Sequence, residues 1–118
     1  MRVLVIGAST NPARTSHHAI HRLRSKGHDV FAIGRSVSKV ADVDIDEGLP
    51  EMSMIDTITL YVNPTVLKMY KEYIKEIHPR RVIFNPGTED DSYMTELAKM
   101  GIVVEEACTL VLLRTNQF

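Results

Sequence analysis

The chain has 118 residues, which is enough for one domain (residues 1–118) and leaves no room for a second. A hydrophobic fraction of 44% and a net charge of −1 are those of an ordinary globular protein, with no global field that would attract nucleic acid or an anionic membrane. The single cysteine, Cys108, excludes an internal disulfide, and no segment approaches the roughly 20 apolar residues that span a bilayer. We therefore expect a cytoplasmic protein.

The first quarter of the chain predicts a strand, a turn and a helix. Residues 3–6 form an unbroken apolar run, which is typical of a strand covered on both faces. Residues 7–12 are turn formers. Apolar and small residues then recur at helical spacing over residues 16–23, and Gly27 stands where a helix ends.

The middle of the chain predicts a second strand at residues 29–33 and a third at residues 55–62. Residues 37–54 between them fit no long element. A helix is expected over residues 66–77, because its apolar residues fall on one face and Pro79 fixes its end.

The last part predicts a fourth strand at residues 81–84 and a fifth at residues 102–104. Between them, residues 90–92 offer N-cap chemistry for a helix that Gly101 ends. The apolar tail, residues 109–113, is expected to pack as a short helix.

Alternating strands and helices with continuous apolar strands predict an α/β fold. We expect one Rossmann-like, doubly wound domain whose five-stranded parallel sheet has the order 3-2-1-4-5, with helices on both faces. In such a sheet, ligands bind beyond the carboxyl ends of the strands, where the strand order reverses. The predicted order puts this point between the strands at residues 3–6 and 81–84. The turns around it are Gly7-Ala8-Ser9, Asn85-Pro86-Gly87, Gly34-Arg35-Ser36 and Asn63-Pro64.

The first of these turns carries the chemistry of an anion site. Gly7 lets the backbone approach a ligand closely, and residues 9–11 add hydroxyl and amide donors. The helix that follows points free N–H groups and its positive dipole end into the same space. Arg14 adds a planar charged fork that suits phosphate. A diphosphate is the natural occupant of such a site.

The usual dinucleotide fingerprint G-x-G-x-x-G is absent, because Ser9 and Pro12 fill its second and third glycine positions. The acidic residue that would hold the adenosine ribose is missing as well, since Gly34 and Arg35 follow the second strand. Both departures argue against NAD. A basic residue there suits a phosphorylated ribose, either the 2′-phosphate of NADP or the 3′-phosphate of CoA, and Arg35 and Lys39 are the candidates.

A ten-residue motif resembles the opening signature of the small CoA-binding proteins: Gly7-Ala8-Ser9-x-Asn11-Pro12-x-Arg14-x-Ser16. These proteins are single Rossmann-type domains related to the CoA-binding domain of the succinyl-CoA synthetase α subunit. The resemblance extends along nearly the whole chain, through the later strand exits to the late Cys108. The family often has Asn-Pro-Lys where this chain has Gly34-Arg35-Ser36, and commonly has a glutamine-containing turn where it has Asn85-Pro86-Gly87.

The resemblance implies coenzyme A as the ligand and assigns residues to its parts. Those implied along the diphosphate are Gly7, Ala8, Ser9, Asn11 and Arg14. Those implied near the adenosine, at the exit of the second strand, are Ile33, Gly34 and Arg35. Those implied along the rest of the crevice are Asn63, Pro64, Asn85 and Gly87.

We therefore expect a module that binds CoA or a short acyl-CoA without catalysis of its own, because many members of that family have no assigned activity. An NADP-binding domain or small oxidoreductase is a second possibility, although the chain has no evident substrate domain and no catalytic Ser-Tyr-Lys set. A regulatory subunit that acts through a protein partner is a third. The apolar tail makes a homodimer plausible.

Three other features have ordinary interpretations. Cys108 could form a disulfide with the CoA sulfur, but its neighbours Glu105 and Glu106 would not activate the thiol, so we expect a buried and inert cysteine. His17 and His21 are four residues apart but have no third metal ligand, so we expect no metal. The acidic residues within 42–47 lack the glycine and bidentate glutamate of a calcium loop and are expected to be solvated charges of a loop.

Overall fold

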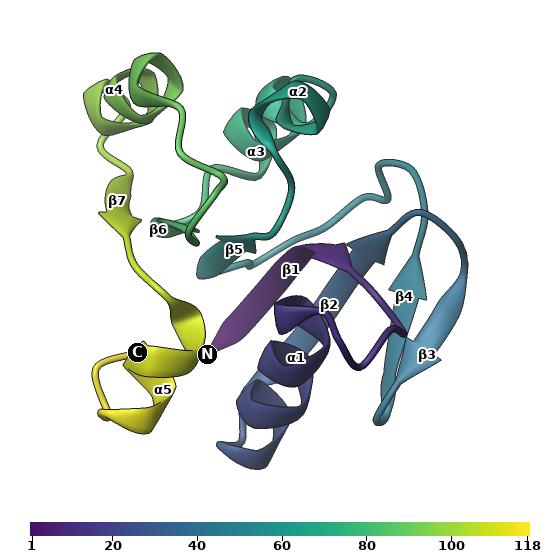
Figure 1. Ribbon diagram of the computed structural model, residues 1–118. Helices are drawn as coiled ribbons and strands as arrows, with labels where there is room; N and C mark the ends of the chain where they lie inside the picture. The colour runs from purple at the N-terminus through teal and green to yellow at the C-terminus, as the bar shows by residue number, and fades with distance from the viewer.

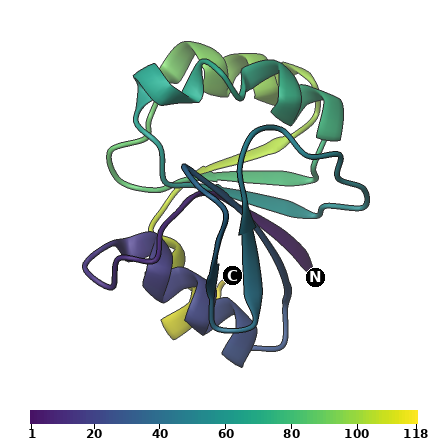
Figure 2. The ribbon, with the colours of Figure 1, turned by 90° about the vertical axis from the view of Figure 1, so that its right-hand side faces the viewer.

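A seven-stranded sheet lies between two layers of helices in the computed structural model, which describes residues 1–118 (Figures 1 and 2). The strands are β1 (Arg2–Ala8), β2 (Asp29–Gly34), β3 (Ser38–Val40), β4 (Val43–Asp46), β5 (Thr57–Leu60), β6 (Arg81–Phe84) and β7 (Val103–Glu106). The helices are α1 (Thr15–Ser25), α2 (Pro64–Leu67), α3 (Lys71–Ile77), α4 (Asp91–Lys99) and α5 (Thr109–Arg114). None of them is long and apolar enough to cross a membrane.

The α/β, Rossmann-like class predicted from the sequence is confirmed, but the five-stranded order 3-2-1-4-5 is wrong. The sheet order is β3-β4-β2-β1-β5-β6-β7, and every pair is parallel except β3 with β4. The strand that was predicted to lie outside β2 is β5, and it pairs with β1 instead, with Leu4 opposite Ile58. The strand order therefore reverses between β1 and β5, and not between β1 and β6.

The place outside β2 is taken by a hairpin from the segment that the sequence left unassigned. Val43 and Ile45 of β4 are buried, while Asp44 and Asp46 are exposed. The alternating acidic residues therefore belong to the solvent side of a strand, which corrects their interpretation as loop charge. Asp42, in the hairpin turn, pairs with Arg24 of α1 through Nη2 and Oδ2 at 2.7 Å.

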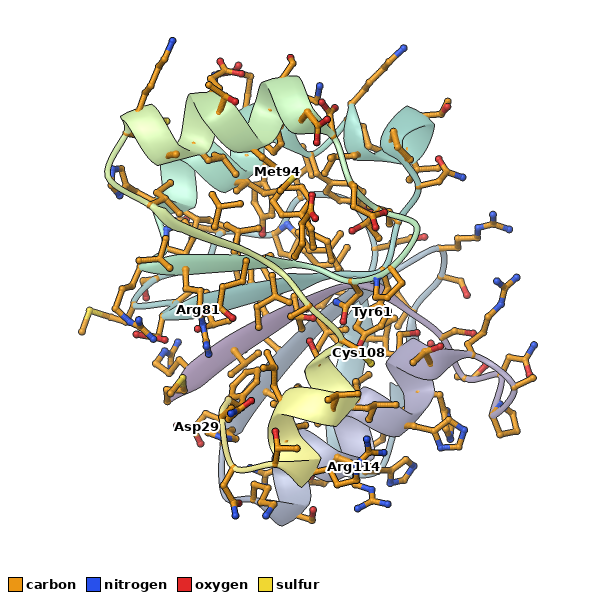
Figure 3. The ribbon with its side chains drawn as sticks, turned by 60° about the vertical axis from the view of Figure 1, so that its left-hand side comes forward. Asp29, Tyr61, Arg81, Met94, Cys108 and Arg114 are labelled. Atoms are coloured by element: carbon orange, nitrogen blue, oxygen red, sulfur yellow. The ribbon has the colours of Figure 1, made fainter.

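The unbroken apolar run in β1 reflects burial on both faces of the sheet. Val3 and Val5 pack in the core beneath α1 and α5, while Leu4 and Ile6 belong to the larger core beneath α2, α3 and α4. Met94 of α4 points toward the sheet within that larger core (Figure 3). The central strands β1, β5 and β6 are thus fixed from both sides, and their carboxyl ends form a rigid edge.

The helices largely follow the predicted pattern. Gly27, with φ of +85°, follows the end of α1, and the Asp90 carboxylate caps α4 by accepting from the N–H of Tyr93 at 3.1 Å. The apolar tail forms α5, as predicted. The helix predicted over residues 66–77 is instead two helices, α2 and α3, and the break between them lets Tyr70 pack into the larger core.

Candidate functional site

A crevice of about 600 Å³ opens at the carboxyl ends of β1, β2, β5 and β6. This volume lies within the range of sites that hold small molecules or cofactors. Its lining comes from four strand exits, the start of α1, the start of β3, α2 and the residue before α3. The lining residues are Gly7, Ala8, Ser9, Thr10, Arg14, Thr15, Ser16, Gly34, Arg35, Ser36, Ser38, Tyr61, Val62, Asn63, Val66, Tyr70, Pro86, Gly87 and Thr88. The crevice lies at the point where the observed strand order reverses, which is where ligands bind in open parallel sheets.

The β1–α1 turn, residues 9–14, is organised by its own hydrogen bonds. The N–H of Asn11 donates to Ser9 Oγ at 3.0 Å, and the N–H of Ala13 donates to Asn11 Oδ1 at 2.9 Å. The N–H of Arg14 donates to the carbonyl oxygen of Asn11 at 2.9 Å. Asn11 is therefore a scaffold of the turn, and it is not among the residues that line the crevice.

Four backbone N–H groups of lining residues in the β1–α1 turn and the first turn of α1 are left without a partner inside the protein. They belong to Ser9, Thr10, Thr15 and Ser16, all of which line the crevice. The side chain of Ser16 makes no hydrogen bond either, although the residue is only 3% exposed. The first N–H groups of a helix have no intrahelical partner, so this cluster of donors is suited to an acceptor-rich, anionic group.

The charged side chains that line the crevice are all positive. Arg14 and Arg35 line the crevice, and neither forms an ion pair with a carboxylate. No aspartate or glutamate is among the lining residues. Lys39, the other cation predicted for a ribose phosphate, lies in β3 and outside the lining. The crevice is thus locally positive in a protein whose net charge is close to zero.

Two glycines bring the backbone of neighbouring strand exits together at the crevice. Gly7 has a φ of +96°, and a Cβ placed on it would lie 2.8 Å from the backbone carbon and oxygen of Tyr61. A Cβ on Gly34 would lie 2.5 Å from the carbonyl oxygen of Ala8. Gly34 ends β2, at the position where a dinucleotide-binding fold carries the acidic residue that binds the ribose. Because of the close contact with Ala8, an acidic side chain has no room there.

The remaining predicted residues divide between the lining and the scaffold beneath it. Asn63 and Gly87 line the crevice, but Asn63 also caps α2, because its Oδ1 accepts from the N–H of Val66 at 2.9 Å. Pro64, the first residue of α2, and Ile33, which is fully buried, are outside the lining. The N–H of Gly87 is already occupied, since it donates to Glu89 Oε1 at 2.7 Å.

Asn85 is a buried structural residue and does not line the crevice. Its Nδ2 donates to Thr59 Oγ1 at 2.7 Å and to the carbonyl oxygen of Leu60 at 2.8 Å. Its Oδ1 accepts from the N–H of Thr109 at 2.8 Å. Asn85 therefore ties the exits of β5 and β6 to the start of α5, and its effect on the crevice is indirect.

Sequence reasoning missed several lining residues, which are Thr15, Ser38, Tyr61, Val62, Val66, Tyr70 and Thr88. Thr15 could have been predicted from the sequence, because it lies in the first turn of the helix that follows the glycine turn. Val66 and Tyr70 had the apolar spacing of an ordinary helix face. Only the placement of β5 beside β1 brings these two residues to the crevice.

Cys108 lies at the start of α5, near Tyr61 in the side-chain view (Figure 3). It is half-buried and is not part of the crevice lining. The hydroxyl of Tyr61 is buried without a hydrogen-bond partner, and this burial raises the pKa of Tyr61 to about 12. The phenol is therefore neutral at physiological pH.

The fold is that of a Rossmann-like α/β domain with a crevice at the carboxyl ends of its strands. The sequence matches the family model described as the CoA binding domain over residues 1–114, and the protein belongs to this family. No curated protein matches the sequence.

Solved structures share the fold. An uncharacterized protein has 37% sequence identity and a TM-score of 0.95, and the alignment covers 99% of this chain and 97% of that one. A protein from Thermus thermophilus has 19% identity, a TM-score of 0.86 and coverage of 99% and 90%. A conserved hypothetical protein from Pyrococcus furiosus has 24% identity, a TM-score of 0.76 and coverage of 88% and 90%. The last two similarities establish the fold alone.

Proposed function

We propose that the crevice binds coenzyme A or a short acyl-CoA, with the diphosphate held by the Gly7-Ala8-Ser9 turn and the N-terminus of α1. The observation that carries the proposal is the set of four unpaired N–H groups at the β1–α1 turn and the start of α1, beside the side chain of Ser16, which makes no hydrogen bond inside the protein. Backbone N–H groups at a helix N-terminus are suited to phosphate, because they add directed donors to the positive end of the helix dipole. Membership of the CoA binding domain family supports the same ligand.

The two arginines of the lining take separate roles in this proposal. Arg14, at the N-cap position of α1, would pair with the diphosphate. Arg35, at the exit of β2, would pair with the 3′-phosphate of the adenosine. The adenosine then lies between the exits of β2 and β5, where Ser36, Val62 and Tyr70 contribute to the lining.

The composition of the lining supports binding without catalysis. Its titratable side chains are two arginines and two tyrosines, with no histidine, carboxylate, lysine or cysteine. Burial raises the pKa of Tyr61 to about 12 and also raises the pKa of Tyr70. The crevice thus contains no group that titrates near neutral pH to serve as a general base or nucleophile, and we propose that the domain holds its ligand unchanged.

NADP is the alternative ligand, since Arg35 would suit its 2′-phosphate as well as the 3′-phosphate of CoA. NAD is disfavoured, because the tight contact of Gly34 with Ala8 leaves no room for the acidic residue that binds an unmodified ribose.

Isothermal titration of the protein with CoA, NADP and NAD tests the proposal. We expect CoA to bind and Arg14→Ala to weaken its binding about 10- to 150-fold, as for the loss of a charged hydrogen bond. Arg22→Ala is the matched control, because Arg22 is exposed on the same helix and does not line the crevice. Binding of NADP without CoA would replace the proposed ligand. Binding of CoA that both variants weaken equally would refute the role of Arg14.

A further inference from the structure

His17 reaches back from the first turn of α1 to the β1–α1 turn. Its Nδ1 lies 3.1 Å from the carbonyl oxygen of Ser9, and the Nε2 of His18 lies 2.7 Å from the carbonyl oxygen of Pro12. A carbonyl oxygen can only accept a hydrogen bond, so each of these two ring nitrogens must carry a proton. The adjacent histidines therefore hold the turn through two separate bonds.

The bond from His17 fixes the direction of an N–H group at the crevice. In a trans peptide the C=O and N–H bonds point in opposite directions, and the chain has no cis peptide. Holding the carbonyl of Ser9 toward His17 thus turns the N–H of Thr10 the other way. Thr10 lines the crevice, and its N–H is one of the four without a partner in the protein.

The bond from His18 has no such consequence. The peptide whose carbonyl it holds is that of Pro12 and Ala13, and the N–H of Ala13 already donates to Asn11 Oδ1 at 2.9 Å. The direction of this peptide is therefore fixed from its other side as well. His18 supports the turn but presents no free donor to the crevice.

We propose that His17 is a positioning residue, which orients the Ser9–Thr10 peptide so that the N–H of Thr10 donates to the diphosphate. The inference rests on the proposed function, since it assigns a purpose to a donor of the same site. His17 is not part of the lining and needs no contact with the ligand. Neutral His17 is then the Nδ1–H tautomer, whereas neutral His18 is the Nε2–H tautomer.

Two substitutions separate this role from a general structural one. Asn places an N–H donor where His carries Nδ1, whereas Gln places one nearer to Nε2. We expect His17→Gln to weaken CoA binding about 3- to 10-fold, the effect of losing one hydrogen bond, and His17→Asn to stay within about 2-fold of the wild type. His21→Gln is the control, because its ring lies 4.9 Å from that of His17 but makes no hydrogen bond. Equal affinity of the Gln and Asn variants would overturn the proposal.

A spectroscopic measurement tests the same role without ligand. The ¹⁵N signals of the imidazoles should report the Nδ1–H tautomer for His17, and the Nε2–H tautomer there would overturn the proposal. The backbone amide signal of Thr10 should move in His17→Gln and return toward its wild-type position in His17→Asn. If the wild type fails to bind CoA, the proposed function fails, but this amide comparison still decides whether His17 orients the turn.

Discussion

Three glycine-to-alanine substitutions test how tightly the strand exits approach at the crevice. Gly27→Ala introduces only backbone strain, because φ is +85° and nothing lies within 4 Å of the added Cβ. Gly34→Ala introduces only a clash, with Ala8 O at 2.5 Å and Ile45 Cγ2 at 2.9 Å. Gly7→Ala introduces both, at a φ of +96° and with the backbone of Tyr61 at 2.8 Å.

The magnitudes follow from these two effects. A left-handed conformation costs an alanine about 1–2 kcal/mol, of which the stiffer unfolded chain returns about 0.5 kcal/mol. Overpacking against a fixed backbone costs about 1–3 kcal/mol. We therefore expect the free energy of unfolding to fall by about 1 kcal/mol in Gly27→Ala, by about 1–3 kcal/mol in Gly34→Ala and by about 2–4 kcal/mol in Gly7→Ala.

Urea denaturation of the three variants, with the m-value checked for constancy, measures these differences. CoA binding should survive in Gly27→Ala, since Gly27 is outside the crevice lining, and weaken in the other two. A Gly34→Ala variant as stable as the wild type would refute the close contact of Gly34 with Ala8, because the exits of β1 and β2 would then be looser than the structure indicates. Equal losses of stability in Gly7→Ala and Gly27→Ala would show that the contact of Gly7 with Tyr61 contributes nothing to the effect.

Three further predictions concern the ribose phosphate, the scaffold and the pH dependence. In calorimetric titrations, Arg35→Ala should weaken the binding of CoA but not of dephospho-CoA. Lys39→Ala should leave the binding of both ligands unchanged, because Lys39 lies outside the lining. Equal losses of affinity for both ligands in Arg35→Ala would contradict the pairing of Arg35 with the 3′-phosphate. Asn85→Ala should lower the free energy of unfolding by about 2–4 kcal/mol in urea, because it removes three buried hydrogen bonds, to Thr59, Leu60 and Thr109. Burial, the amino group of Met1 and the Arg81 guanidinium lower the pKa of His28, so below about pH 6.5 the unfolded chain binds protons more readily than the folded protein. The free energy of unfolding should therefore fall as the pH is lowered below about 6.5, and the contribution of His28 should level off below its folded pKa. In His28→Gln this dependence of stability on pH should be weaker. An unchanged pH dependence would show that His28 does not cause it.

Local chemistry made the first strand, the turn and α1 predictable. The four apolar residues of β1, the glycine at a positive φ and the helical spacing that ends at Gly27 all act within a short stretch of chain. The same holds for α4, whose N-cap Asp90 could be recognised without knowing its neighbours in space.

The order of the strands could not be predicted in the same way. Every residue of both β5 and β6 is buried, so the burial that the sequence reveals does not distinguish which strand lies beside β1. The β3–β4 hairpin was missed because short alternation of Val43 and Ile45 with aspartates was interpreted as loop. Once that hairpin takes the position outside β2, β5 lies beside β1, and the crevice gains Val66 and Tyr70.

The predicted site residues also differ in whether the local sequence reveals their role. Gly7, Ser9 and Arg14 belong to one continuous motif and lie together in the crevice. Asn85 lies at the exit of a strand, where polar residues are common. Its side-chain amide makes three hydrogen bonds inside the protein. Whether a polar side chain faces a ligand or the scaffold depends on partners far away in the sequence, which residue type alone does not reveal.

The most direct test of the account is a ¹H–¹⁵N titration of the protein with CoA. We expect the largest changes of amide signals at Ser9, Thr10, Thr15 and Ser16, because these residues line the crevice and their N–H groups have no partner in the protein. The amide of Gly87 should change less, because Glu89 already accepts its hydrogen bond. Saturable binding with the main changes elsewhere, for example at the amino ends of the strands, would contradict the proposed site, and the absence of any change would contradict CoA as its ligand.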